Sequence, residues 1–533
     1  MENKKHSFIK GALILTIAGL VSKVLGAIYR IPLGQIITSE GMAYHQTAYD
    51  LYVLMLTFSS YSIPTAISKL VSERLEEGRR DEAHKIFKVA MGLLATIGLI
   101  LSVTLYFNAD TFTQAFKNPG SYFAVLAVSP AIFTVSISGA FRGYFQGMQN
   151  MTPSAVSQVT EQLSRVLVGF LLAYLFLPYG YMVSAAGAIF GTTVGGLVSF
   201  ITLYIIYRKD RPRIMVELNQ FKGKKTEPVV SIIGRIIKFA LPIMIGGSIM
   251  PIMNLLDTFI VMDRLQAAGF NQVTATKLFG QLKGIATSFV NVPQVFTISL
   301  AASLVPSISE SMVRKDLEVV RRKSKLALKM SLLLGLPAAM GLFILAGPIM
   351  QMFYPNETES LGLALRFVSP AVIFLTLVQT MTGILQGMGK ERIPVVNMVI
   401  GASAKAVISY VLTSMPVLNI NGAALGTVLG YAVAAVLNYR ALVKYQKKSL
   451  NIISISVKPA IATAVMTVSA YYSHKLFYGF TGRNSIAALL GIFIGVVVYG
   501  VVIILIKGVT KEELDSAPGG QKLSKMLKKR GLI

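Results

Sequence analysis

Residues 486–506 read IAALLGIFIGVVVYGVVIILI, an apolar stretch without a charged side chain. A helix rises about 1.5 Å per residue, so about 20 residues cross a hydrocarbon layer of about 30 Å. Because lipid offers no hydrogen-bond partner to the backbone, such a segment must be helical. Apolar stretches of spanning length recur at 8–33, 86–107 and 230–253. The sequence therefore predicts a polytopic, all-α membrane protein.

The composition agrees with this class and excludes several others. Apolar residues make up 53% of the chain and charged residues 14%, whereas soluble proteins carry about 25% charged residues. The net charge of +27 would suggest nucleic acid in a soluble protein, but here the basic residues lie in short connections between apolar blocks. We therefore expect membrane lipids around the chain and no nucleic-acid partner.

The sequence carries no signal for enzyme chemistry. The absence of cysteine excludes disulfides, thiol catalysis and cysteine metal sites, and the four histidines are scattered. There is no HExxH motif and no GxxxxGK[ST] loop. The acids of the longest connection, Asp210, Glu217 and Glu227, show no catalytic spacing. We expect a transporter without a metal or cofactor, driven by a coupling ion or the membrane potential.

Fourteen spans are predicted, with boundaries accurate to about 2–4 residues. They are 8–33, 46–70, 86–107, 121–148, 153–176, 183–207, 230–256, 280–309, 325–346, 360–387, 394–413, 422–443, 457–475 and 485–507. One set of connections is basic, at 74–85, 208–225, 314–323, 390–392, 444–448 and 522–530. The opposite set is poor in basic residues, at 110–117, 178–182, 356–359 and 416–421. The positive-inside rule places both termini in the cytoplasm. Residues 73–84 are predicted to form a short amphipathic cytoplasmic helix.

The two halves of the chain repeat each other. The tetrapeptide VSPA at 128–131 recurs at 368–371, an offset of 240. Gly143, Gln146, Gly147 and Met148 recur at that offset as Gly383, Gln386, Gly387 and Met388. Gly187-Ala188 and Gly191-Thr192 recur at an offset of 235 as Gly422-Ala423 and Gly426-Thr427. Six spans in each half give parallel repeats, and substrate sites lie where such repeats meet.

The duplication and the charge pattern predict the domain organisation. The expected parts are an N-lobe at 1–207, a cytoplasmic linker at 208–229, a C-lobe at 230–443, two extra spans at 444–507 and a basic cytoplasmic tail at 508–533.

Charged residues inside a span are candidates for function, because burying them in lipid costs several kcal/mol. Lys23 and Arg30 lie in the first span, seven residues apart and so on one face. Arg30 is equally compatible with snorkelling to the outer interface. Lys23 is deeper, which favours a place in a cavity. Gly19 and Gly26 nearby permit close helix approach.

Arg165 and Lys405 stand at the same position of the two repeats, at an offset of 240. Each is about 12 residues into its span, roughly 18 Å from the cytoplasmic end, so each half places one cation near mid-membrane. Glu161 precedes Arg165 by four residues and can pair with it along the helix. One alternative is that Glu161 only neutralises Arg165 for burial.

Three further charges complete the candidate list. Arg142 shares a face with Gln146, and snorkelling and substrate contact are both open for it. Asp257 and Lys283 form a candidate gate or ion-coupling pair. A cavity lined by these residues would be net positive, which favours an anionic substrate such as a diphosphate.

Five motifs stand out along the chain: Ile9-Lys10-Gly11, Ser22-Lys23-Val24-Leu25-Gly26, Pro64-Thr65-Ala66-Ile67-Ser68-Lys69, RGYFQG at 142–147 and Pro306-Ser307-Ile308-Ser309. Together they resemble the multidrug/oligosaccharidyl-lipid/polysaccharide exporter superfamily, and within it the polysaccharide flippases. The branch looks like the bacterial group of stage V sporulation protein B and the lipid II flippases, and the resemblance covers nearly the whole chain.

The resemblance implies a V-shaped bundle of two lobes around a cationic cavity, with alternating access. It implies a lipid-linked oligosaccharide substrate, carried on undecaprenyl diphosphate across the bacterial cytoplasmic membrane by a monomer. It also implies that the last two spans form a groove for the lipid tail. Basic residues of the first, second and eighth spans matter in that family. Lys23 matches the first, Lys69 the second, and Lys283 is the basic residue nearest to the third, at a different spacing.

Two rival functions remain open on these residues. One is a cation-coupled exporter of small molecules within the same superfamily. The other is an envelope scaffold that moves nothing.

Overall fold

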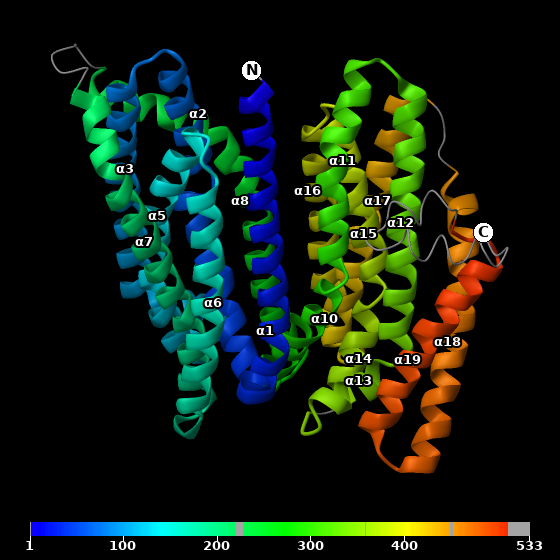
Figure 1. Ribbon diagram of the computed structural model, residues 1–533. Coiled ribbons are helices and arrows are strands. Elements are labelled where there is room, and N and C mark those ends of the chain that lie inside the picture. The colour runs from blue at the N-terminus through cyan, green and yellow to red at the C-terminus, as the bar shows by residue number, and fades with distance from the viewer. Residues whose placement is uncertain (1, 220–226, 358, 448–450, 510–533) are drawn as a thin grey trace. The chain divides into compact units, whose positions relative to one another are not determined.

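The computed structural model describes residues 2–219, 227–357, 359–447 and 451–509, and these residues are almost entirely helical (Figure 1). The α-helices are α1 (Glu2–Leu56), α2 (Ile63–Glu76), α3 (Arg80–Phe107), α4 (Ala109–Ala115), α5 (Tyr122–Gly147), α6 (Thr152–Leu175), α7 (Tyr181–Asn219), α8 (Val229–Ala267), α9 (Gln272–Phe279), α10 (Thr287–Asn291), α11 (Gln294–Val313), α12 (Leu317–Ile344), α13 (Ala346–Phe353), α14 (Glu359–Val368), α15 (Ala371–Gly387), α16 (Arg392–Thr413), α17 (Ile420–Gln446), α18 (Ile452–Thr481) and α19 (Asn484–Leu505). Two π-helical turns join them, η1 (Thr57–Tyr61) and η4 (Gly280–Ala286).

Among the described residues, twelve stretches are long and apolar enough to cross a membrane. The first of them, Ile14–Glu76, covers the predicted span 46–70 and most of the predicted span 8–33, and its backbone breaks at Thr38, where φ is 58°. Helix α6 is not among the twelve but coincides with the predicted span 153–176. The all-α polytopic fold is confirmed, and fourteen spans are consistent with it. Residues 220–226 of the predicted linker and 510–533 of the predicted tail lie outside the described residues.

The predicted helix at 73–84 is wrong. Helix α2 ends at Glu76, and Gly78 turns the chain with a φ of 73° before α3 begins at Arg80. Ion pairs hold this turn, because the Arg74 guanidinium lies 3.0 Å from the Glu82 carboxylate and 3.2 Å from that of Glu227. The polar residues that suggested an amphipathic helix therefore tie α2 and α3 to the start of α8.

The chain packs as two compact units, residues 1–285 and 286–533. Helix α8 packs on α1, α2 and α3, which places the seventh predicted span in the first unit. The predicted lobes, by contrast, follow the sequence repeat, and their boundaries stay a prediction.

Glycine contacts repeat inside the two units, in agreement with the sequence duplication. In the first unit, a Cβ on Gly143 of α5 would lie 2.7 Å from the Pro64 carbonyl oxygen of α2. In the second, a Cβ on Gly383 of α15 would lie 2.8 Å from the Ala301 carbonyl oxygen of α11. Each glycine thus lets an equivalent pair of helices approach closely.

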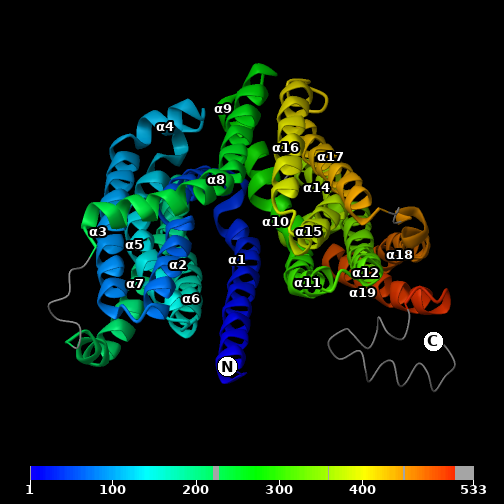
Figure 2. The ribbon, with the colours of Figure 1, turned by 90° about the horizontal axis from the view of Figure 1, so that it is seen from above.

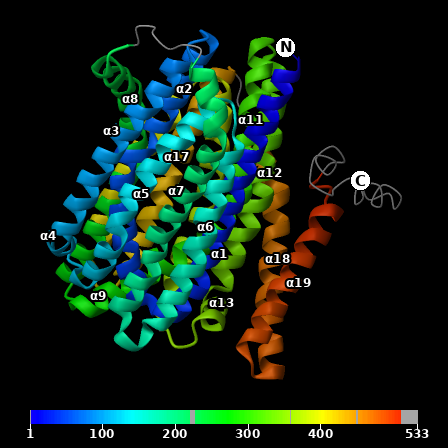
Figure 3. The ribbon, with the colours of Figure 1, turned by 60° about the vertical axis from the view of Figure 1, so that its left-hand side comes forward.

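The last two helices form a hairpin in the second unit. Helices α18 and α19 lie side by side and pack against α12 (Figures 2 and 3). The Tyr499 hydroxyl donates a hydrogen bond to the Leu333 carbonyl oxygen at 2.8 Å. The two predicted spans without a partner in the repeat therefore attach to the second six-helix set.

Candidate functional site

Two arginines share one carboxylate inside the first unit. Arg142 of α5 donates to Glu161 of α6 at 2.7 Å, and Arg165, one turn along α6, reaches the other oxygen of Glu161 at 3.5 Å. All three side chains are largely buried. We call these residues the Arg–Glu–Arg trio. Its two guanidinium groups face a single carboxylate, so one positive charge is left without a protein counter-charge within the trio.

The two arginines differ in how firmly they are held. Arg142 also donates to the hydroxyl of Ser157 at 3.0 Å and to that of Ser199 at 2.8 Å, so it bridges α5, α6 and α7. Arg165 makes only the long contact with Glu161, and its Nε is buried without a hydrogen-bond partner among the described residues. Arg165 therefore has more hydrogen-bond donors available for an anion than Arg142 has.

Close packing of α7 on α6 fixes the backbone that carries Glu161 and Arg165. A Cβ on Gly191 of α7 would lie 2.5 Å from the Arg165 carbonyl oxygen, and one on Gly195 would lie 2.7 Å from the Glu161 carbonyl oxygen. The spacing of four residues puts Glu161 and Arg165 on one face of α6. Gly191 is one of the repeat glycines, so the duplicated motif fixes the backbone that carries the charges.

Tyrosines of α1 lie near Arg165, and one of them also contacts Arg30. The Arg30 guanidinium lies 5.4 Å from the centre of the Tyr49 ring, a cation–π geometry. The phenols of Tyr29, Tyr49 and Tyr52 are electrostatic neighbours of Arg165. The cation–π contact gives Arg30 a defined place inside the first unit.

A second charged cluster joins α8 to the π-helical turn η4. Asp257 of α8, only 4% exposed, forms an ion pair with Lys283. Next to Asp257 in sequence, Thr258 donates to Asp50 of α1 at 3.0 Å, and Gln46 donates to Asp50 at 2.8 Å. π-Helical turns often occur at functional sites. The predicted pairing of Asp257 with Lys283 is confirmed as a contact.

Asp50 is the residue that sequence reasoning missed. It lies inside a predicted span and is 7% exposed, so its acidic side chain within an apolar block was the available signal. His45, one turn earlier, is also buried, and its Nδ1 has no hydrogen-bond partner among the described residues.

The remaining predicted residues lie elsewhere. Lys23 is exposed on α1. Lys69 is half-exposed, 3.8 Å from Glu73, with its ammonium 3.9 Å from the centre of the Phe239 ring. Neither contacts the trio through a hydrogen bond or ion pair among the described residues.

Lys405 belongs to the second unit but repeats the setting of Arg165. A Cβ on Gly430 of α17 would lie 2.7 Å from the Lys405 Cβ, and one on Gly426 would lie 3.1 Å from the Lys405 carbonyl oxygen. Helix α16 thus carries Lys405 against α17 as α6 carries Arg165 against α7. The equivalence predicted from the offset of 240 is confirmed at the level of helix packing.

Comparison with known proteins agrees with this architecture. The family model "Polysaccharide biosynthesis protein" matches residues 8–312, more than half of the chain, and the model MatE matches residues 242–411. Stage V sporulation protein B of Bacillus subtilis is 28% identical over 96% of this chain and 98% of its own. Lipid II flippase MurJ of the same organism is 27% identical over 86% of this chain and 87% of its own.

A solved structure shares the fold. Lipid II flippase MurJ in an inward closed conformation superimposes with a TM-score of 0.69 at 18% identity, covering 93% of this chain and 98% of that one. The chain therefore belongs to the polysaccharide biosynthesis protein family of the multidrug/oligosaccharidyl-lipid/polysaccharide exporter superfamily, as a multi-pass membrane protein of the flippase and transporter type.

Proposed function

We propose that this protein flips an undecaprenyl-diphosphate-linked sugar, the peptidoglycan precursor lipid II, across the bacterial cytoplasmic membrane by alternating access. Two relatives support this proposal, because one is named a lipid II flippase and the other a sporulation protein of comparable length. The membrane environment of the fold suits a cargo whose prenyl tail stays in lipid.

The observation that carries the proposal is the incomplete neutralisation of Arg165. It shares Glu161 with the better-bonded Arg142, and its Nε has no hydrogen-bond partner among the described residues. A guanidinium presents paired N–H donors that match phosphate oxygens. We assign Arg165 to the diphosphate, with Lys23 on α1 as a second contact, and Lys405 is the corresponding cation of the other repeat.

Charge also supplies a source of energy for the cycle. Moving one elementary charge across the membrane is worth about 2.3 kcal/mol per 100 mV. A membrane potential that is negative inside therefore favours outward movement of the anionic diphosphate and return of an empty, cationic site. The Asp257–Lys283 ion pair, beside the Asp50–Thr258 hydrogen bond, is the gate or ion-coupling element in this scheme.

The test is translocation of lipid II by the purified protein in vesicles. We expect Arg165→Gln to lose at least tenfold in rate and Arg165→Lys to retain part of it. The matched control is Arg314→Gln, because Arg314 is an exposed arginine also paired four residues away, with Glu310. Wild-type rates in Arg165→Gln would remove the residue from the mechanism. In cells depleted of their own flippase, Lys405→Gln should fail to complement at normal expression.

The MatE match at 242–411 favours a second candidate, a cation-coupled exporter of small molecules. Drug resistance on overexpression, without an effect on wall precursors, would support that candidate. Running the vesicle assay with lipid II and with a lipid-linked teichoic or polysaccharide precursor separates the cargoes. A protein that moves none of them would be a scaffold.

A further inference from the structure

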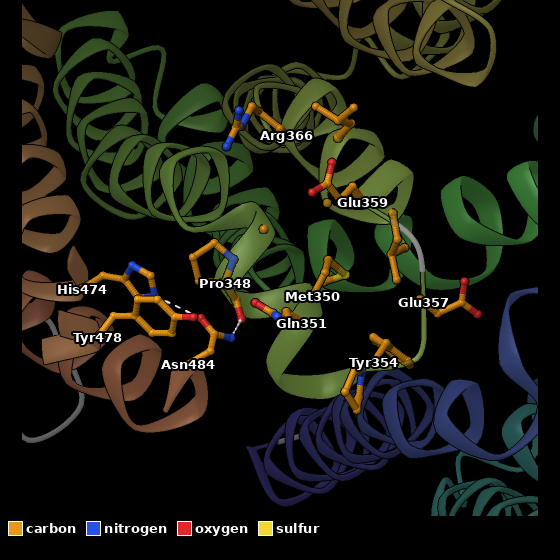
Figure 4. Close-up of a pocket in the computed structure, with 15 residues that line it drawn as sticks. Pro348, Met350, Gln351, Tyr354, Glu357, Glu359, Arg366, His474, Tyr478 and Asn484 are labelled. Carbon is orange, nitrogen blue, oxygen red and sulfur yellow. Dashed lines mark hydrogen bonds between the residues drawn. The ribbon is translucent and has the colours of Figure 1, made fainter. Parts of the chain in front are cut away.

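The second unit contains a pocket that the proposed cargo site does not use. It is a cavity of about 500 Å³ between α13, the start of α14 and the ends of α18 and α19 that meet at their turn (Figure 4). Its size lies within the range of about 300–1,000 Å³ typical of small-molecule sites. The loop before α14 belongs to the connections that the positive-inside rule places outside the cell, so the pocket is expected on the outer side.

One wall of the pocket is fixed by polar contacts. The side chain of Asn484 bridges two elements, because its Oδ1 lies 3.0 Å from Nε2 of His474 and its Nδ2 donates to the Pro348 carbonyl oxygen at 2.9 Å. The His474 ring stacks on Tyr478, with centroids 6.0 Å apart and planes 11° apart. Figure 4 shows both hydrogen bonds on one side of the pocket. This wall is therefore preformed.

The opposite wall carries two unlike charges from α14. Glu359 and Arg366 line the pocket, and both are exposed. Among the described residues neither makes a hydrogen bond or an ion pair. They are seven residues apart, so they share one face of α14 and are separated by about 10.5 Å along its axis. That separation prevents them from pairing with each other and leaves both available to one ligand.

We propose that this pocket binds a short peptide with a free ammonium and a free carboxylate group. Glu359 takes the ammonium and Arg366 the carboxylate, each as a charge-assisted hydrogen bond. An extended chain spans about 3.3–3.6 Å per residue, so a tripeptide of about 10 Å matches the two charges. The peptide is either free or attached to the cargo, and the second source rests on the proposed function.

The chain contains no tryptophan, so one introduced tryptophan is the sole indole emitter. Tyr478→Trp places it on the preformed wall. With the full-length protein in nanodiscs, trialanine should give a saturable fluorescence change, and N-acetyl-trialanine and trialanine amide should each bind at least tenfold more weakly. Calorimetry with the wild-type protein, which lacks the introduced tryptophan, should rank the affinities of the three peptides in the same order.

Two charge variants assign the ends of the peptide. Arg366→Gln should bind trialanine and its amide equally, and Glu359→Gln should bind trialanine and its acetylated form equally. The control Arg314→Gln, remote from the pocket, should keep the wild-type preferences. Dialanine and pentaalanine should both bind more weakly than trialanine.

Three results would overturn the proposal: no saturable signal by either method, equal binding of the three trialanine forms, or equally tight binding of an uncharged disaccharide. A transport measurement with lipid II and added trialanine distinguishes a free peptide from a peptide attached to the cargo. Inhibition of lipid II flipping by trialanine assigns the pocket to the peptide part of the cargo, and binding without inhibition assigns it to a free peptide. Because peptide binding is measured without transport, failure of the flippase proposal leaves this test intact.

Discussion

Removing Arg142 should mainly lower stability, whereas removing Arg165 should mainly abolish transport, although the two arginines share one carboxylate. Arg142→Met deletes three hydrogen bonds, to Ser157, Glu161 and Ser199. Interhelical hydrogen bonds in membrane proteins average about 0.6 kcal/mol, so their loss costs about 2 kcal/mol. We therefore expect a loss of about 2 kcal/mol in the free energy of unfolding.

Arg165→Met removes a single contact of 3.5 Å, so its cost should stay below about 1 kcal/mol. Unfolding by SDS in mixed micelles, followed by far-UV circular dichroism, measures both variants, and the vesicle assay measures transport. Arg165→Met should be stable and inactive. Arg142→Met should be less stable than the wild type, because Glu161 then keeps only its 3.5 Å contact with Arg165. The reasoning fails if Arg165→Met is the less stable variant, or if it transports normally.

Three further outcomes follow from the packing and the charges. Gly430→Leu should disrupt the contact of α17 with α16 and lower the melting temperature by several degrees, whereas Gly500→Leu, at a position with nothing within 4 Å, should not. Burial alone would raise the pKa of Glu227, but the Ser231 hydrogen bond and the Arg235 and Arg74 guanidinium groups outweigh it and lower the pKa. The native state then binds fewer protons than the unfolded chain, so this contribution is present above the usual glutamate pKa of about 4.3 and is lost as pH falls below it. Melting curves should show that Glu227→Gln loses less stability than the wild type between pH 5 and pH 3. Asp257→Asn and Lys283→Met should each reduce transport under an imposed ion gradient at least tenfold, and the charge swap of the two residues should restore part of it.

The helix pattern and the repeat were predictable because they depend on local or periodic features of the chain. Apolar length locates most of the spans, although α6 falls outside the stretches that qualify by length and hydropathy. The shared offset of 240 identified Arg165 and Lys405 as equivalents, and the repeated glycines fix the backbones that carry them. The one-turn spacing of Glu161 and Arg165 likewise predicted their contact.

Contacts between segments that are distant in the sequence were harder to predict. Arg142 was open between snorkelling and substrate contact, and only the packing of α5 on α6 and α7 shows that Glu161, Ser157 and Ser199 hold it. Residues 73–84 look amphipathic, but their charges pair across the α2–α3 turn and with Glu227, far along the chain. Such pairings are set by tertiary structure and leave no periodic trace.

The two repeats arrive at the same surplus of charge by different residues. In the first, the Arg–Glu–Arg trio combines two cations with one carboxylate. In the second, the positions at an offset of 240 are Thr382, Gly401 and Lys405, which carry one cation and no carboxylate. A Cβ on Gly401 would lie 2.6 Å from the Gly430 carbonyl oxygen, so the packing of α17 fills the space where a carboxylate would otherwise stand. At these equivalent positions each repeat therefore carries one more cation than carboxylates, which agrees with a proposed cargo that is an anion rather than a cation.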